Sequence, residues 1–288
     1  MKVYPECGPC MLRQAGEAID LATDDQRLKI DTINNVFKFL ASNFKVGASS
    51  NKIGTNMHRI IKKKTKCHDP YIKKKEIGTQ IAIGLFDEVQ KILKKDNSLE
   101  NHVKIAILGN ILDFAALGLG SDFEKMIKDN LKKDLAINHI EDLKRTIENE
   151  DSLLYLVDNT GEILFDKMLI EKFASYDLDI TVAVKEKPIL NDACMEDAIA
   201  IGLEKLATLV STGTDSVGVV YDDLSTDFRE IFDSHSFIIS KGMGNYEGLT
   251  ELNLKNKDVF YLFSAKCSAI AKDSNVNIGD NILLKSKS

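Results

Sequence analysis

The sequence lacks any run of about 18 apolar residues, so it offers no segment long enough to cross a membrane as a helix. Residues 1–7 also lack the apolar core of a signal peptide. We therefore expect a cytoplasmic protein with no membrane partner. The formal net charge of −6 argues against a dedicated nucleic-acid binder, because such proteins present a positive surface to phosphates.

Cysteines are few: the chain has five, an odd and scattered set that excludes a disulfide framework. Cys7 and Cys10 form a C-x-x-C pair before a predicted helix over residues 11–21. A thioredoxin-like dithiol would follow a strand, and no strand precedes this pair. A structural zinc site needs four ligands, which Cys67 and His68 could complete, although no second C-x-x-C exists. We favour a structural metal or thiol packing and leave redox chemistry open.

The composition is that of a globular protein, with 44% hydrophobic and 28% charged residues in 288. Apolar residues recur at helical spacing over residues 25–44 and 79–93, which predicts a mainly helical N-terminal subdomain over residues 1–98. Between these helices, the lysine-rich residues 62–75 contain one aromatic side chain. We expect a solvated loop there rather than a nucleic-acid contact.

Residues 99–288 are predicted to form an α/β domain. Its first segment, residues 102–114, fits a strand or a helix; if it is helical, Asn110 and Asp113 share one face. Beyond residue 150, short apolar runs alternate with helical stretches. The predicted strands are residues 153–157, 180–184, 208–212, 237–240 and 259–263. This alternation predicts a Rossmann-like, mainly parallel sheet.

Polar residues follow the predicted strands, at the edge where α/β sheets bind ligands. Asp158 and Asn159 follow the first strand, and Asp192 comes after the second. Together they would give a half-filled shell of hard oxygen ligands, which suits Mg²⁺ or Mn²⁺. An Asp-Asn turn with Gly161 at positive φ is the plain alternative. The number of strands that end in polar residues favours the metal site.

Lys241 and Lys266 would add positive charge at neighbouring strand ends. Gly242 and Gly244 would let backbone N–H groups approach an anion. This glycine loop is neither a Walker A sequence nor a G-x-G-x-x-G motif, which argues against a nucleotide site of either kind. The metal ligands, lysines and glycines together predict a phosphate pocket.

Several short motifs extend over nearly the whole chain. They are Cys7-x-x-Cys10, Asp69-Pro70-Tyr71, Gly109-Asn110-x-x-Asp113, Asp158-Asn159-x-Gly161-Glu162, Asn191-Asp192, Lys241-Gly242-x-Gly244-Asn245-Tyr246-Glu247 and Lys266-Cys267. In these motifs and their order the chain resembles the DUF89 family of metal-dependent damage-control phosphatases, in its prokaryotic branch with an N-terminal C-x-x-C. Thr160 stands where the family usually has alanine.

The resemblance implies helical subdomains beside one Rossmann-like domain, and a metal held by Asp158, Asn159 and Asp192. It also implies contacts with substrate or phosphate from Glu162, from the segment 242–247 and from Lys266. The residues expected to bind substrate or phosphate are Glu162, Lys241, Gly242, Gly244, Asn245, Glu247, Asn110 and Asp113. Family members act on sugar phosphates and related metabolites, some of them damaged.

Our hypothesis is a phosphatase of small phosphomonoesters that uses Mn²⁺, Mg²⁺, Co²⁺ or Ni²⁺. Lys266 would stabilise the charge that develops in phosphoryl transfer. The nucleophile is either a metal-bound water or Asp158. One alternative is an adenosylmethionine-dependent methyltransferase, although the glycine-rich loop expected after its first strand is missing. Another is a non-enzymatic scaffold that binds metal or nucleic acid.

Overall fold

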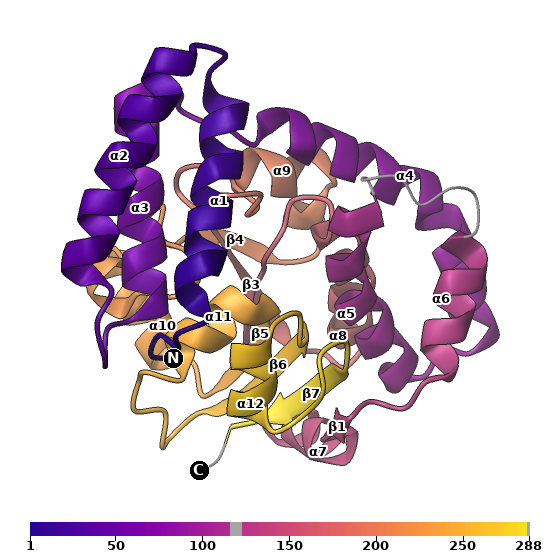
Figure 1. Ribbon diagram of the computed structural model, residues 1–288. Helices are drawn as coiled ribbons and strands as arrows, with labels where there is room; N and C mark the ends of the chain where they lie inside the picture. Colours follow the sequence, from indigo (N-terminus) through magenta and orange to yellow (C-terminus); the bar gives the residue numbers. More distant parts are fainter. Residues whose placement is uncertain (116–122, 287–288) are drawn as a thin grey trace.

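The computed structural model describes residues 1–115 and 123–286, and the side chains at 110–115, 123, 124 and 126 lie outside the described set. Among these residues, seven strands form one sheet in the order β1-β7-β6-β5-β2-β3-β4 (Figure 1). The strands are β1 Ile137–Asn138, β2 Ser152–Leu156, β3 Asp179–Val184, β4 Thr208–Ser211, β5 Phe237–Lys241, β6 Asp258–Ser264 and β7 Asn281–Lys285. All neighbours run parallel except β6 and β7. The predicted α/β class is confirmed.

Both faces of the sheet are buried, so the strands are nearly continuous apolar runs rather than alternating ones. In β2, Leu153 and Tyr155 face one layer of helices, whereas Leu154 and Leu156 face the other. The first layer includes α5 Leu99–Ala115, α7 Ile140–Asn149 and α8 Ile163–Ala174. The second includes α10 Thr226–Ser234, α11 Gly242–Leu249 and α12 Ser268–Ser274.

The strand order reverses direction at β2. From β2 the chain adds β3 and β4 on one side, then returns to add β5 and β6 on the other. At such a switch point the connections after two adjacent strands leave in opposite directions and open a crevice at the carboxyl edge. The segments after β2 and β5 therefore meet at the edge where the sequence predicts the site.

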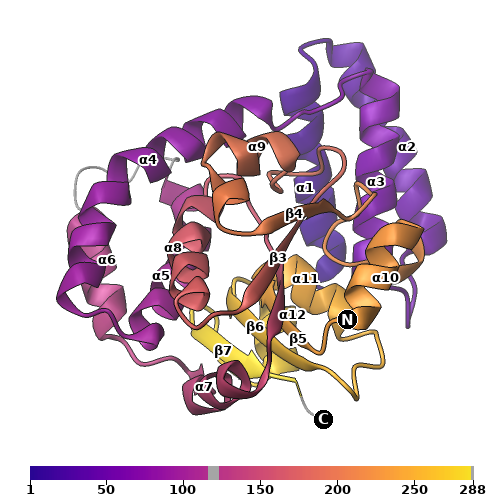
Figure 2. The ribbon, with the colours of Figure 1, turned by 180° about the vertical axis from the view of Figure 1, so that it is seen from behind.

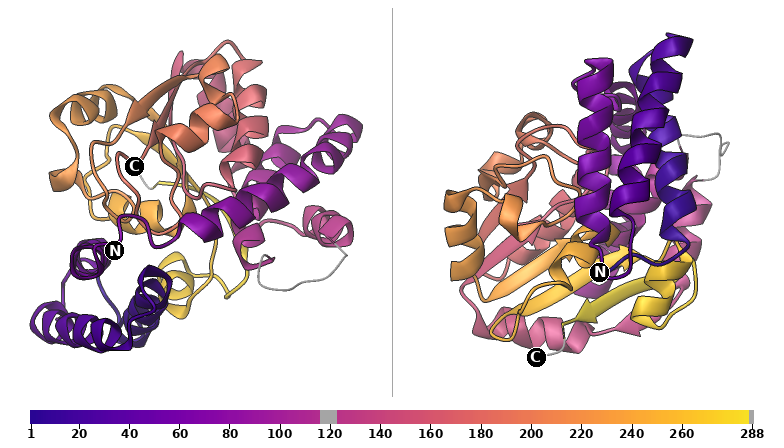
Figure 3. Two further views of the ribbon diagram at one scale, coloured as in Figure 1. Left: turned by 90° about the horizontal axis from the view of Figure 1, so that it is seen from above. Right: turned by 60° about the vertical axis from the view of Figure 1, so that its left-hand side comes forward.

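The N-terminal part is helical. Helices α1 Cys7–Ala22, α2 Gln26–Asn43 and α3 Ser50–Thr65 lie side by side and share an apolar core (Figures 1 and 3). Helix α4 Ile72–Lys95 then runs from this cluster to α6 Phe123–Lys132 (Figure 2). The ambiguous segment 102–114 is helical, within α5. The division between residues 98 and 99 stays a prediction.

The predicted solvated loop over residues 62–75 is wrong. Helix α3 continues to Thr65 and α4 begins at Ile72, so most of the lysines lie on helices. Lys75 is buried, with its Nζ 3.4 Å from an Asp69 carboxylate oxygen and 3.8 Å from one of Asp197. Asp69 belongs to the same segment, but Asp197 is distant in the sequence, so the local charge pattern does not reveal that Lys75 is buried and paired.

Cys7 lies in the first turn of α1, where it packs against the apolar cores on both sides of it. Its Sγ accepts the Tyr4 N–H at 3.4 Å, and burial raises the pKa of its thiol. The cysteines are free thiols, and no group of three or more His, Cys, Asp or Glu within the described ranges could hold a metal ion. The structural role of Cys7 and Cys10 stays a prediction. No helix among the described residues is long and apolar enough to span a membrane.

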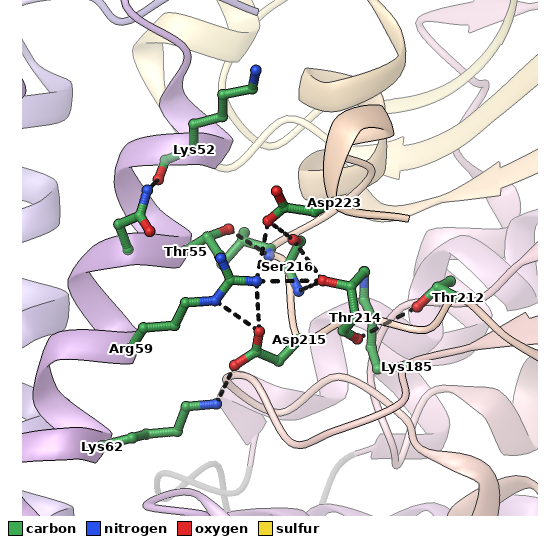
Figure 4. A network of polar contacts seen from close by, with 12 residues as sticks. Lys52, Thr55, Arg59, Lys62, Lys185, Thr212, Thr214, Asp215, Ser216 and Asp223 are labelled. Carbon is green, nitrogen blue, oxygen red and sulfur yellow. Dashed lines mark hydrogen bonds and ion pairs between the residues drawn. The ribbon is translucent and has the colours of Figure 1, made fainter. Parts of the chain in front are cut away.

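Helix α3 docks on the loop that joins β4 to α10 through a network of ion pairs (Figure 4). Arg59 donates through Nε to one carboxylate oxygen of Asp215 at 2.8 Å, and Lys62 donates to the other at 2.7 Å. The Arg59 guanidinium also pairs with Asp223 at 3.1 Å. These contacts hold the helical cluster against the α/β part, because one carboxylate receives two cations from one helix face.

Asp215→Asn should weaken this docking in a pH-dependent way. Burial works to raise the pKa of Asp215, but hydrogen bonds from Lys62 and Arg59 outweigh it and hold the pKa below the ordinary 3.8. The stabilisation is therefore complete above pH 3.8 and is lost as pH falls through the lower folded value. We expect a loss of about 1–2 kcal/mol at neutral pH, after allowance for solvent screening.

Urea unfolding at pH 7 and near pH 3 measures this difference, which should be smaller at the acidic end. Asp222→Asn is the matched control, because Asp222 meets Lys52 at 2.6 Å on the solvent-exposed surface and should change little. Equal losses for Asp215→Asn at both pH values would contradict the ion-pair explanation.

Candidate functional site

The first acidic segment, residues 158–162, leaves β2 at the switch point. Asp158 is partly buried, and its carboxylate lies over Gly242, the first residue of α11. Gly242 has φ +77°, and a Cβ there would overlap the Asp158 carboxylate. The glycine is therefore required twice, for its backbone conformation and for the space that the carboxylate occupies. The positive end of the α11 dipole faces that carboxylate.

The Asn159 side chain is fixed by two carboxylates. Its Nδ2 donates to Asp158 Oδ2 at 3.1 Å and to Glu162 Oε2 at 2.9 Å. Carboxylates accept hydrogen bonds, so they determine which end of the amide is the NH₂ group. The amide oxygen of Asn159 is thus turned away from both and is left for another partner, such as a cation.

The second acidic segment lies against the first through backbone contacts. Asn159 and Asp192 form an isolated antiparallel bridge, and the Ala193 N–H donates to the Asp158 carbonyl at 2.8 Å. The Asp192 carboxylate lies 3.6 Å from Lys185 Nζ. The structure therefore brings Asp158, Asn159 and Asp192 together, as predicted from the ends of their strands.

Clustered negative charge dominates this edge. Burial, followed by the nearby carboxylates of Glu162 and Asp192, raises the pKa of Asp158 well above its usual range. Burial also raises the pKa of Asp192 to about 6, although Lys185 counteracts it. A divalent cation would relieve both effects, since it favours the ionised carboxylates. Two carboxylates and one amide oxygen are hard ligands, so these residues fit Mg²⁺ or Mn²⁺.

Lys241, predicted to contact phosphate, is fully buried at the end of β5. Its Nζ donates to Glu162 Oε1, to Asp166 Oδ1 at 2.6 Å and to the Ala106 carbonyl at 2.8 Å. An ammonium has three donors, and all three are used inside the protein. The predicted phosphate contact stays a prediction, while the geometry shows Lys241 joined to Glu162.

Sequence reasoning missed Asp166 and Tyr155. Asp166 is fully buried on α8, one turn after Glu162, and the Tyr155 hydroxyl donates to its Oδ1 at 2.9 Å. Burial raises the pKa of Asp166 to about 7, despite the opposing charge of Lys241. The i, i+4 spacing of Glu162 and Asp166, on either side of the apolar residues 163–165, was the available signal.

Lys266 follows β6 and is partly buried. Its positive charge acts to lower the pKa of Asp158, which places the two side chains within electrostatic reach of each other. Its backbone N–H donates to Met243 Sδ at 3.3 Å, so the segment after β6 lies against the start of α11. Lys266 thus belongs to the same edge as the acidic segments.

The segment predicted as a glycine loop, residues 242–247, is the helix α11, and the prediction of a loop was wrong. Its close packing explains the difference: a Cβ on Gly248 would overlap the Val219 carbonyl, so glycines serve helix packing. Asn245 donates to the backbone carbonyls of Val157 and Lys241, at 3.0 and 2.9 Å.

Glu247 lies toward the other end of α11, where its carboxylate accepts the Ser50 hydroxyl at 2.5 Å. The contacts of Asn245 and Glu247 with phosphate stay predictions. Asn110 and Asp113 lie in the last turns of α5, and their side chains are outside the described residues.

Helix α4 packs against the acidic edge at Gly161. Gly161 meets it without a side chain between them, since a Cβ on Gly161 would be 2.9 Å from the Gly78 backbone. This contact, rather than a positive φ, accounts for the glycine of the acidic motif. A cavity of about 390 Å³ lies elsewhere, between α4, α5 and α8, beside His102 and Lys172.

Gly242→Ala should displace the Asp158 carboxylate. The substitution forces a β-carbon into both a left-handed backbone conformation and an occupied space, so we expect a loss of stability of about 1–2 kcal/mol or more. Gly244→Ala is the matched control in the same helix, because its Cβ would meet no atom closer than 3.5 Å. Thermal unfolding of the two variants measures the difference; equal melting temperatures would contradict the packing described.

Comparison with known proteins identifies relatives of the whole chain. Residues 3–282 match the Damage-control phosphatase ARMT1-like domain. A damage-control phosphatase of Pyrococcus horikoshii is 35% identical over 288 residues, with 100% of this chain and 99% of that protein covered. An uncharacterized protein of Methanocaldococcus jannaschii is 38% identical over 291 residues, with 99% and 96% covered.

A damage-control phosphatase of Archaeoglobus fulgidus is 30% identical over 287 residues, with 98% of each chain covered. The crystal structure of a DUF89 family protein from Pyrococcus horikoshii superposes with a TM-score of 0.91 at 34% identity, and the match covers 100% of both chains. The whole chain thus shares one fold and one sequence pattern with these proteins, and it belongs to the DUF89 family of ARMT1-like damage-control phosphatases.

Proposed function

We propose that this family member hydrolyses small phosphomonoesters at the carboxyl edge of β2, β5 and β6. The observation that carries the proposal is the junction of two acidic segments, in which Asp158, Asn159 and Asp192 meet beneath α4. Carboxylates gathered in a buried edge raise one another's pKa, and a divalent cation is the partner that such a cluster fits best.

Asp158, Asn159 and Asp192 would hold the cation, which is Mn²⁺, Mg²⁺, Co²⁺ or Ni²⁺ in this proposal. When bound, the metal supplies Lewis-acid polarisation of a phosphoryl oxygen. The amide oxygen of Asn159 is available for this role, because its NH₂ group is committed to Asp158 and Glu162.

Lys266 and the first turn of α11 form the phosphate side of the proposed site. A helix N-terminus supports an anion through its N–H groups and dipole, and the helix here is eight residues long. Lys266 adds a positive charge that would stabilise an oxygen as it gains charge during transfer. The attacking group is either water or the carboxylate of Asp158, which faces both the proposed cation and α11.

The substrates that we propose are sugar phosphates and related metabolites, including damaged ones. Damage-control phosphatase is also the name of two relatives that match almost the whole chain. Nucleic acid is not a proposed partner, given the net charge of −6. A cytoplasmic location completes the proposal.

Removal of the metal should abolish phosphatase activity. The purified chain should release phosphate from p-nitrophenyl phosphate, lose the activity in EDTA and regain it with Mn²⁺, Mg²⁺, Co²⁺ or Ni²⁺. Asp192→Asn should reduce the affinity for the metal, since it removes one anionic ligand. Full activity in excess EDTA would contradict the proposed chemistry. If the activity depends on the metal, a panel of sugar phosphates defines the substrate class.

Lys266→Ala should slow catalysis more than it weakens binding. We expect kcat to fall roughly 10²–10³-fold, as when an oxyanion donor is removed, with a smaller change in KM. Mn²⁺ should still bind, because no metal ligand has been removed. Steady-state kinetics and Mn²⁺ calorimetry make the test. Near-normal kcat, or loss of Mn²⁺ binding, would exclude the assigned role.

A further inference from the structure

The side chains of Asp166, Lys241, Glu162 and Asn159 form a continuous chain of contacts from the core to the acidic edge. Asp166 Oδ1 accepts from Lys241 at 2.6 Å, Lys241 donates to Glu162 Oε1, and Glu162 Oε2 accepts from Asn159 at 2.9 Å. Each link joins a donor to a carboxylate, so each is charge-assisted and strongly directional. Through these contacts, the position of the fully buried Asp166 carboxylate determines the orientation of the Asn159 amide that faces the proposed metal.

The two carboxylate oxygens of Glu162 accept from different side chains. Lys241 holds Oε1, which leaves Oε2 directed at the Asn159 NH₂ group. The side chain is 1% exposed, so water does not compete for it. If Glu162 rotated, the Asn159 amide would lose the shorter of the two hydrogen bonds that distinguish its nitrogen from its oxygen, and Asp158 alone would orient it.

Lys241 is held in turn by a tripod of acceptors from two helices. The acceptors are the Ala106 carbonyl on α5 and the carboxylates of Glu162 and Asp166 at the start of α8. Only Asp166 is both anionic and remote from the acidic edge. It is also fixed from its other side by the Tyr155 hydroxyl, which comes from β2.

We propose that Asp166 is a positioning residue for the metal site: through Lys241 and Glu162, it keeps the amide oxygen of Asn159 turned toward the cation. The inference rests on the proposed function, because it assumes that Asn159 is a metal ligand. Asp166 itself touches neither Asn159 nor substrate and has no catalytic role in the proposal. Contacts behind a ligand commonly change metal affinity 10–100-fold.

Asp166→Asn tests the proposal, since it preserves the shape of the side chain and removes its charge. The buried cluster then holds one ammonium and one carboxylate, which is a balanced pair, so the variant should fold. We expect Mn²⁺ affinity to fall about 10-fold or more in calorimetry. The visible absorption of the Co²⁺-loaded protein should also change, because the spectrum reports the identity and arrangement of the ligands.

Thr146→Val is the matched control. Thr146 is also buried and donates its hydroxyl to a carboxylate, that of Asp258 at 2.9 Å, but Asp258 begins β6 and so lies at the amino edge of that strand, opposite to the acidic edge. It should lower the melting temperature without changing Mn²⁺ affinity or the Co²⁺ spectrum. A loss of affinity in both variants alike would reduce Asp166 to a general structural role and overturn the proposal.

Unchanged Mn²⁺ affinity in the folded Asp166→Asn variant would also overturn the proposal. Weaker Mn²⁺ affinity with an unchanged Co²⁺ spectrum would overturn it too, because the loss would then come from the missing charge alone and not from a moved ligand. If Asp166→Asn does not fold, Glu162→Gln replaces it. Glutamine has one acceptor oxygen and cannot serve both Lys241 and Asn159. An unaltered Co²⁺ spectrum in that variant would overturn the proposal.

Mn²⁺ titration of the wild type distinguishes failure of the proposed metal site from failure of the positioning role. If the wild type binds no Mn²⁺, or if Asp158→Ala binds it as well as the wild type, the proposed metal site fails and the positioning role fails with it. If the wild type binds Mn²⁺ through Asp158 and Asp166→Asn is indistinguishable from it, only the positioning role fails.

Discussion

The architecture of this edge depends on one constraint: the ammonium group of Lys241 is fully buried. Such a group is tolerated in a protein interior only when anionic and carbonyl acceptors surround it. For Lys241 these acceptors come from α5 and α8, while the lysine itself ends β5. The ion cluster consequently fixes both helices to the sheet at the switch point. A shift of α8 would leave a charge unpaired, so the acidic segment that precedes α8 is held in place.

Close packing at three glycines also shapes this edge. Gly161 meets Gly78 of α4, and Gly242 leaves room for the Asp158 carboxylate. Gly109 is the third such position, because a Cβ there would lie 3.1 Å from Glu162 Cγ. These glycines occur in three motifs far apart in the sequence, yet each one bounds the same acidic edge. Gly109 and Gly242 let the backbone approach a functional side chain, whereas Gly161 lets two backbone segments meet.

Sequence patterns predicted the parts of this site that depend on local order along the chain. The apolar run before Asp158 identifies a strand and its end, and parallel strands bring their ends to one edge, so the meeting of Asp158 with Asp192 followed directly. Strand β1 was not predicted, since its two residues carry no periodicity, and the five-residue strand β7 was also missed. The extent of α4 was also underestimated, because its first turn consists of lysines.

The role of Lys241 could not be read in the same way. A lysine after an apolar run looks like the exposed end of a strand, and only the packing of α5 and α8 over it makes it buried. Asp166 escaped notice for the related reason that its buried partner Lys241 lies 75 residues away in the sequence. Whether a charged side chain is buried depends on elements that are distant in sequence, and local sequence patterns do not show which of these elements pack together.

Charge balance links the core cluster to the proposed chemistry. Four carboxylates gather here, those of Asp158, Glu162, Asp166 and Asp192. Lys241 contacts two of them, Glu162 and Asp166, and Lys185 lies near Asp192. A divalent cation would add positive charge where these carboxylates are concentrated. Lys266 lies at the side where a phosphoryl group would bring further negative charge. A fold that concentrates carboxylates in this way is stabilised by the ion it binds, so metal binding and the integrity of the edge are coupled.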